Sequence, residues 1–514
     1  MKKKLTLVLA LLICAVLAVP AMADGGYPLE TDTTLDVWFA EIVLSSTFTS
    51  PDEVPLLQTI EEKTGVDVNW IFPAAGSDTA TAYNLMMANG DLPDIIWSAD
   101  IVTNATTYLN DGTIVDLTDW ITEEYAPNLL AYIGDDESIL KAYTTDDGRR
   151  FGFPSLCYAS IWTGPYVRTD WLEECGLDIP VTIEDWTEML TAFHDKYGAQ
   201  LSTLGNFRNV FLGAYGVTTI EKDQGFYMPD GKTVTYAPAC EGFRDYLTQM
   251  HAWYEAGLID PDYLSNDQTI LISKCVEGTT GAMVGYQVTG ANISLAANDP
   301  ETGAKWLAIP YPVLEEGGRS YTEASLTTLP MASAVTADCE DVETAVRFLD
   351  WLYSDEGLTA MNFGVEGESF EYDADGNPHY TETFLSGPEG MVEYARRYTA
   401  IVGNTPGVKT EEAAIDRNDE ASNVAEATWL GDWSVSEFSS YLIPVLSPTE
   451  EEVEETTDRL SALTTYVREN TYKFITGERS LDEFDDYVNT LYDTYELDEV
   501  IAIRQAQVDR VLSR

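Results

Sequence analysis

The sequence is poor in basic residues. Its 514 residues include 28 Lys and Arg against 87 Asp and Glu, with only 3 His, so the formal net charge is −59. A surface of this sign repels nucleic acid and anionic membranes, and we exclude both as partners. The charge also keeps a chain soluble, and we prefer that interpretation to a specific cationic ligand.

Cysteine and histidine are too few and too scattered for a disulfide framework or a metal centre. Beyond residue 23 there is an odd number of Cys and no C-x-x-C pair, and a chain this long buries a core without disulfides. The His residues form no H-E-x-x-H motif. The segment Asp373-Ala-Asp-Gly-Asn377 has the acids of a calcium loop. However, Gly376 falls at its fourth position and Phe384 occupies the place of the bidentate Glu, so we predict a hairpin turn. We expect no metal and no cofactor.

Long hydrophobic runs are absent except at the N-terminus. There Lys2 to Lys4 precede the apolar run Leu5–Val19, and Ala21-Met-Ala23 is a cleavage site of the A-x-A type. This is the pattern of a secretory signal peptide, and the run is shorter than the roughly 20 residues of a spanning helix. We expect export and cleavage after Ala23, which removes three Lys and changes the net charge from −59 to −62. A lipid anchor at Cys14 is the alternative, although Leu and Ile precede that residue where a lipobox has small residues.

Strands and helices alternate along the mature chain. Leu35, Val37 and Phe39 predict a strand, and a helix that ends at Gly65 follows it. A second strand over residues 66–72, a helix over 81–88 and a strand at 95–96 complete a β-α-β-α-β order, which is typical of a parallel sheet. Further helices are predicted from capping boxes and amphipathic segments, at Ser50, Thr182, Ser447 and Ser480 and over Asp341–Asn362.

One of these predicted strands ends in residues that suit a sugar. The apolar pair Ile95-Ile96 is followed by Trp97, Ser98 and Asp100. In open α/β sheets, ligands bind outside the carboxyl ends of the strands. An indole face stacks on a sugar ring, and a carboxylate accepts hydrogen bonds from hydroxyl groups.

Several short motifs, taken in order, resemble the family 1 extracellular solute-binding proteins of bacterial ABC importers. One is the turn Gly90-Asp-Leu-Pro-Asp94 with its flanking helix and strand. The later motifs resemble the larger, oligosaccharide-type branch of that family. Besides the turn at Gly90, the motifs that resemble the family are, in chain order, Glu61-Glu-Lys-Thr-Gly-Val66, Val167-Arg-Thr-Asp-Trp-Leu172, Leu352-Tyr-Ser-Asp-Glu-Gly-Leu358, Asn362-Phe-Gly-Val-Glu-Gly367, and Phe474-Ile-Thr-Gly-Glu478 followed by Leu481-Asp-Glu-Phe-Asp-Asp-Tyr487.

The resemblance implies an α/β, periplasmic-binding-protein-like fold, with two α/β lobes joined by a hinge and the ligand cleft between them. We expect crossovers near Pro154 and Pro310, with 1–23 as signal peptide, 24–155 and 312–362 in lobe 1, and 156–311 and 363–514 in lobe 2. The resemblance also implies an oligosaccharide ligand, delivery to an ABC transporter permease, a monomer and no catalysis.

The candidate ligand contacts are aromatic and polar residues at strand ends that face this cleft. For Trp38 we favour packing in the core over contact with ligand. For Trp97, Trp162 and Trp429 the two roles are equally favoured. For Arg168 we favour an ion pair with a neighbouring carboxylate. Tyr286 and Trp433 are assigned to the ligand on the resemblance. The full set is Trp38, Glu41, Trp97, Asp100, Trp162, Tyr166, Arg168, Tyr286, Trp429 and Trp433.

Two other functions stay open. A secreted glycoside hydrolase needs two facing carboxylates at a defined separation, and a chain with 87 acidic residues always offers such pairs. A sugar sensor or adhesin without a transport role would use the same fold, because fold alone does not decide function.

Overall fold

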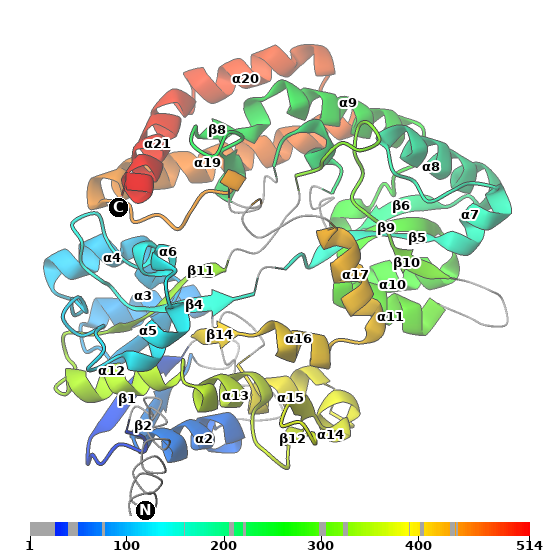
Figure 1. Cartoon of the computed structure of the whole chain (residues 1–514). Helices are drawn as coiled ribbons and strands as arrows, with labels where there is room; N and C mark the ends of the chain where they lie inside the picture. Colours follow the sequence, from blue (N-terminus) through cyan, green and yellow to red (C-terminus); the bar gives the residue numbers. More distant parts are fainter. Residues whose placement is uncertain are drawn as a thin grey trace, which may run out of the picture.

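The structure, a computed structural model, describes residues 26–39, 50–73, 78–158, 160–204, 210–218, 223–297, 305–321, 327–389, 391–400, 406–431, 437 and 440–513. Within these ranges the chain forms two α/β lobes, each built on its own sheet (Figure 1). The expected signal peptide lies outside the described residues.

The sheet of lobe 1 is mainly parallel. Its strand order is β14-β4-β11-β3-β1-β2, and only β11 runs antiparallel to its neighbours. Both faces of the central strands are buried, because neighbouring side chains alternate between two apolar clusters. Phe39 and Trp97 belong to one cluster, and Trp38 and Ile96 belong to the other. The strands are β1 (Thr34–Phe39), β2 (Asp67–Ile71), β3 (Ile95–Ser98), β4 (Phe153–Cys157), β11 (Thr328–Val335) and β14 (Gly407–Lys409).

Helices cover both faces of this sheet, and a small helical and hairpin unit extends it (Figure 1). The helices are α2 (Pro55–Thr64), α3 (Thr79–Asn89), α4 (Asp100–Asp111), α5 (Pro127–Ile133), α6 (Glu137–Ala142), α12 (Val342–Trp351), α13 (Asp355–Phe363), α14 (Glu382–Ser386), α15 (Met391–Tyr398) and α16 (Glu411–Arg417). The hairpin consists of β12 (Phe370–Tyr372) and β13 (Pro378–Tyr380).

Lobe 2 is built on a smaller mixed sheet with the order β10-β5-β9-β6. Its strands are β5 (Thr163–Arg168), β6 (Gln200–Thr203), β9 (Thr280–Tyr286) and β10 (Trp306–Ala308), with a separate hairpin of β7 (Phe226–Tyr227) and β8 (Thr235–Tyr236). Its helices are α7 (Thr169–Cys175), α8 (Ile183–Tyr197), α9 (Glu241–Glu255), α10 (Gln268–Glu277), α11 (Gln287–Ala297), α17 (Glu420–Leu430), α19 (Glu450–Thr476), α20 (Phe484–Asp493) and α21 (Leu497–Ser513).

The chain crosses between the lobes more than once. Residues 158–162 join β4 to β5, the segment from residue 309 to β11 returns, and residues 418–419 join α16 to α17. A fourth segment before α19 touches lobe 1, where Val445 joins a core cluster and Ser447 Oγ donates to Thr144 O at 3.4 Å. Figure 1 shows the C-terminal helices α19 to α21 lying along lobe 2, with the C-terminus near α4 of lobe 1.

The β-α-β-α-β order agrees with the sequence prediction, whereas several helix boundaries differ. The predicted helix Asp341–Asn362 is two helices, because Ser354 caps α13 and Gly357 packs on the carbonyl of Trp351. Two predicted helix starts lie later than expected. A 3₁₀ turn precedes α2, and the capping box of α19 is Thr449 with Glu452 rather than Ser447.

The segment after residue 362 packs differently from the expected lobe boundary. β14 pairs in parallel with β4, and Asn362 Nδ2 donates to Val408 O at 2.7 Å. Helix α15 contacts α2. β14 therefore extends the lobe 1 sheet, α15 packs on lobe 1, and in the described part of the chain lobe 2 is entered again at α17.

Candidate functional site

The strand directions place one edge of each sheet at the crossings between the lobes. In lobe 1 the parallel strands β1, β3, β4 and β14 end at the same edge, and β11 begins there. In lobe 2 the ends of β6, β9 and β10 lie beside the start of β5, which follows the first crossing. Carboxyl ends of strands are where α/β proteins bind ligands.

The two lobe 1 tryptophans of the candidate set lie in the core. Trp97 is 0% exposed, with its ring 4.4 Å edge-on from Phe39 and 5.8 Å from Trp70. Trp38 is also buried, on the opposite face of the sheet. Neither indole N–H has a hydrogen-bond partner among the described residues. Packing explains both side chains without a ligand.

Asp100 lies at the edge of lobe 1, as the first residue of α4. Ser98 Oγ donates to Asp100 Oδ2 at 3.0 Å, so the two polar groups at the end of β3 hold each other. The carboxylate is only partly buried and keeps acceptor positions open. Glu41, the other acidic candidate of this lobe, lies outside the described residues.

The first crossing brings Trp162 and Tyr286 together. Thr163 pairs with Tyr286 in the sheet, and Gln287 N donates to Trp162 O at 2.9 Å. Trp162 is 38% exposed, so its ring is open to contact. Gln287 Oε1 is buried with no hydrogen-bond partner among the described residues. An exposed aromatic ring at a crossing fits contact with a sugar, because the ring face can stack on it.

The lobe 2 candidates Tyr166 and Trp429 pack on each other instead. Their rings meet edge to face at 5.3 Å, and Trp429 Nε1 donates to Pro165 O at 3.4 Å. Two glycines make room for them, since a Cβ on Gly164 would overlap the Trp429 indole and one on Gly290 would overlap the Tyr166 ring. These rings hold α17 against the lobe 2 sheet.

Arg168 lies at the far end of β5, away from the crossing. Its Nη2 and Nε donate to the two carboxylate oxygens of Asp170 at 2.5 and 2.8 Å. Burial raises the pKa of Asp170, but these bonds outweigh it and hold the pKa below its usual value. The guanidinium also lies 4.3 Å from the centre of the Trp171 ring. The structure does not bring Arg168 together with Trp162. Trp433, the last candidate, lies outside the described residues.

A pocket of 380 Å³ lies on lobe 2, where the segment after β10 meets the stretch before α19, and the sequence had not indicated it. Tyr321 comes from the second crossing and Tyr441 from the stretch before α19, and their rings meet edge to face at 4.6 Å. Arg319 Nη1 and Glu437 Oε1 form an ion pair at 2.5 Å. Ring faces with a few fixed polar groups are the usual lining of a small-molecule site, and its lining residues are Pro229, Arg319, Tyr321, Glu437, Ser440 and Tyr441.

The crossings carry a second polar cluster that centres on Glu426 of α17. Burial raises the pKa of this carboxyl above its usual value, the nearby Glu411 raises it further, and the Arg417 guanidinium opposes the shift. Tyr158, whose pKa burial raises to about 12, lies near the same carboxyl and near Arg417. Because its members come from the first crossing, from α16 of lobe 1 and from α17 of lobe 2, a movement of one lobe against the other would change their distances.

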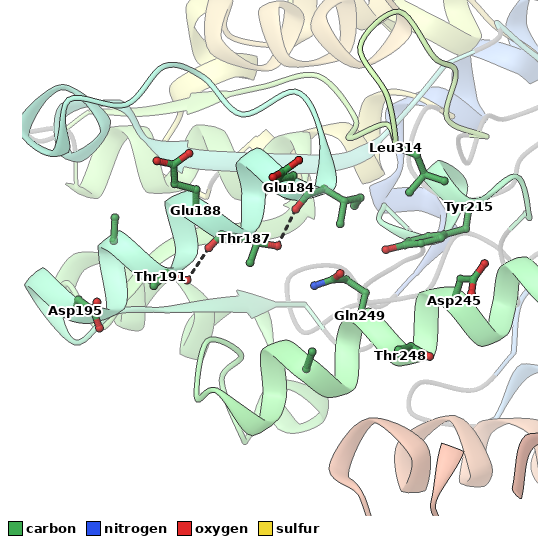
Figure 2. Close-up of a pocket in the computed structure, with 13 residues that line it drawn as sticks. Glu184, Thr187, Glu188, Thr191, Asp195, Tyr215, Asp245, Thr248, Gln249 and Leu314 are labelled. Atoms are coloured by element: carbon green, nitrogen blue, oxygen red, sulfur yellow. Dashed lines mark hydrogen bonds between the residues drawn. The ribbon is translucent and has the colours of Figure 1, made fainter. Parts of the chain in front are cut away.

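Two other cavities lie within single lobes. One of 1090 Å³ lies between α8 and α9, where Figure 2 shows Glu184, Glu188, Asp195 and Asp245 around it. The hydroxyls of Thr187 and Thr191 donate to carbonyls one turn earlier, at 2.8 and 2.7 Å (Figure 2). Those hydroxyls are therefore engaged by the helix itself. The other cavity, of 890 Å³, is on lobe 1 beside Tyr27 and Tyr132. Among the described residues, none of the three cavities is lined by both lobes.

Metal sites and disulfides are absent from the part of the chain that the structure describes. No group of three or more His, Cys, Asp or Glu is placed to hold a metal ion. No disulfide joins the five cysteines there, which are Cys157, Cys175, Cys240, Cys275 and Cys339. The predicted hairpin turn at residues 373–377 is confirmed, since Asp373 Oδ1 accepts from Asp375 N and Asn377 N between β12 and β13. Among the described residues no helix is both long and apolar enough to cross a membrane.

Residues 45–359 match the family model described as "Bacterial extracellular solute-binding protein". The chain belongs to this family of solute-binding proteins. Members of the family are binding proteins, and an extracellular place is part of the family's description. The resemblance seen in the sequence motifs is thereby confirmed.

Among the sequences similar to this solute-binding protein are a lipoprotein and a substrate-binding protein of an ABC transporter. Lipoprotein LipO of Bacillus subtilis (strain 168) is 26% identical over 62% of this chain, and the match covers 64% of LipO, just under two thirds of that relative. The fructooligosaccharide ABC transporter substrate-binding protein FusA of Streptococcus pneumoniae is 23% identical over 94% of this chain and 91% of its own.

Solved structures share the fold of this solute-binding protein over nearly its whole length. The alginate-binding protein AlgQ2 superposes with a TM-score of 0.73 at 20% identity, covering 94% of this chain and 99% of its own. FusA in complex with kestose superposes with a TM-score of 0.71 at 19% identity, covering 94% of this chain and 100% of its own. The predicted periplasmic-binding-protein-like α/β fold is therefore confirmed.

Proposed function

We propose that this solute-binding protein captures a carbohydrate, an oligosaccharide, between its two lobes and delivers it to an ABC transporter permease. The observation that carries the proposal is the end-to-end similarity to FusA, named for fructooligosaccharides. The tyrosine-lined pocket of lobe 2 supports it, because stacking rings and hydroxyl-binding groups are what a sugar needs.

We propose that the contact surface combines this pocket with the residues at the strand ends. Trp162 and Tyr286 supply partly exposed aromatic surface at the first crossing, and Asp100 supplies a carboxylate from lobe 1. Glu41 and Trp433 stay in the proposal on the family resemblance alone. Trp38, Trp97, Tyr166 and Trp429 are packed in the cores, so a contact with ligand would require them to move.

The finer statements about location and partners belong to the same proposal. We propose that the chain is exported, cleaved after Ala23 and monomeric, and that its formal charge of −62 after cleavage keeps it away from nucleic acid. A mature mass that begins at Asp24 is the expected result of mass spectrometry. A lipid on Cys14 at the N-terminus would contradict the cleavage site.

A thermal-shift screen of the mature protein against an oligosaccharide panel tests the function. A ligand that binds only the folded state raises stability by about 2.7 kcal/mol at a hundredfold excess over its Kd. We expect at least one uncharged glycan to raise the Tm and to be recovered unaltered. A flat response across neutral and acidic glycans would contradict carbohydrate capture, and turnover of a glycan would favour the secreted hydrolase. Binding without a permease encoded beside the gene would favour the sensor or adhesin.

A further inference from the structure

The only cation that lines the tyrosine pocket within the described residues is already paired. Arg319 Nη1 lies 2.5 Å from Glu437 Oε1, although these residues are far apart in sequence. Their side chains are 60% and 35% exposed, so the pair faces the pocket and solvent rather than the core. The pocket therefore offers donors from Arg319 and acceptors from Glu437 while its two charges cancel.

An acidic sugar would meet an unfavourable field at this pair. A ligand carboxylate could approach the guanidinium only beside the Glu437 carboxylate, which has the same charge. The chain around it carries 87 acidic residues against 28 basic ones, so the wider field repels anions as well. An uncharged sugar avoids both penalties, because its hydroxyls can donate to Glu437 and accept from Arg319.

We propose that the Arg319–Glu437 pair determines specificity, selecting an uncharged glycan and rejecting one with uronic acids. The inference rests on the proposed carbohydrate function and adds the charge class of the ligand. The question is open in this fold, since the similar structures include an alginate-binding protein as well as a kestose complex.

The test is Glu437→Gln, which keeps the shape of the side chain and removes its charge. Calorimetric titration would compare a galactose oligomer with a galacturonate oligomer of the same length and linkage. The wild type is expected to prefer the uncharged oligomer. In the variant the ratio of uronate to neutral affinity should rise at least about tenfold, which is 1.4 kcal/mol. The gain should shrink as salt is added, because salt screens the interaction.

The matched control is Glu343→Gln beside Arg347 on α12 of lobe 1. This pair has a comparable separation of 3.1 Å, and the change alters the total charge equally. An equal rise in the control would overturn the inference, because the effect would then come from net charge. A second variant, Arg319→Gln with Glu437→Gln, removes both charges and should keep the wild-type ratio. If Glu437→Gln fails to fold, this double variant is measured in its place.

The failure of this inference differs from the failure of the proposed function. If the wild type binds neutral oligomers and Glu437→Gln leaves the ratio unchanged, the pair does not determine specificity, while carbohydrate capture stands. A wild type that prefers the uronate also overturns the inference. If no glycan binds to any variant, the proposed function itself fails.

Discussion

At the scale of single residues, the fit between Gly164 and Trp429 fixes how α17 packs on lobe 2. A Cβ at position 164 would overlap the indole, so Gly164→Ala should force the ring or the strand to shift. We expect a loss of about 1–3 kcal/mol of unfolding free energy, the usual cost of overpacking a core. Chemical denaturation measures the loss.

Gly285→Ala is the control for that prediction. Gly285 pairs with Gly164 across the sheet, and a Cβ there would lie 3.4 Å from Thr289 Cβ, an ordinary contact. It should leave stability nearly unchanged. Equal losses in both variants would show that the strands, rather than the Trp429 contact, resist the added methyl group.

The same residues show what the sequence could and could not predict. The motif Val167–Leu172 correctly placed a strand-to-helix junction, and the alternative pairing of Arg168 with Asp170 was right. Whether a tryptophan faces core or cleft was not predictable, because the contact that buries Trp429 joins β5 to a helix 264 residues later. Sequence periodicity carries no information about such distant packing.

At the scale of elements, Arg510 fastens the last helix of lobe 2 to lobe 1. Its guanidinium pairs with Asp146 in a lobe 1 turn and lies 2.7 Å from Glu452 at the start of α19. Arg510→Gln should loosen this connection and raise amide hydrogen exchange in residues 144–149. Arg459→Gln is the control, because Arg459 pairs with Glu496 and Glu499 inside lobe 2. A rise in both variants, or in neither, would contradict the connection.

The connection between α21 and lobe 1 should also depend on pH. Burial raises the pKa of Glu452, but hydrogen bonds from Arg510 and Thr449 outweigh it, so the pKa lies below its ordinary value of 4.5. Stability from a lowered carboxyl pKa is present above the unfolded value and is lost as pH falls through the folded value. In the wild-type protein, amide hydrogen exchange in residues 144–149 should therefore rise toward the level of the Arg510→Gln variant only below about pH 4.5.

Elements with local signals were predictable and elements with only distant partners were not. The capping box at Thr182 located the start of α8, and the βαβ order located the lobe 1 sheet. β14 has three residues and no periodicity, so its place beside β4 could not be read from sequence. The tyrosine pocket was not predicted for the same reason, because Arg319 and Glu437, which line it, lie 118 residues apart in the sequence.

At the scale of the whole molecule, the lobes are joined by several crossings and by side-chain contacts between them. The polar cluster of Glu426 with Arg417 and the ion pairs of Arg510 both span these joints. Lobes connected in this way close on a ligand by rotation about the crossings. Because the proposed contact surface combines the lobe 2 pocket with Asp100 of lobe 1, ligand binding and closure should be coupled.

Small-angle X-ray scattering of the mature protein, with and without a glycan found in the thermal screen, tests the central claim most directly. Capture between two lobes predicts that the radius of gyration falls on addition of the glycan, and that the glycan is afterwards recovered unaltered. A saturating glycan that leaves the radius of gyration unchanged, or that is converted to products, would contradict capture by lobe closure.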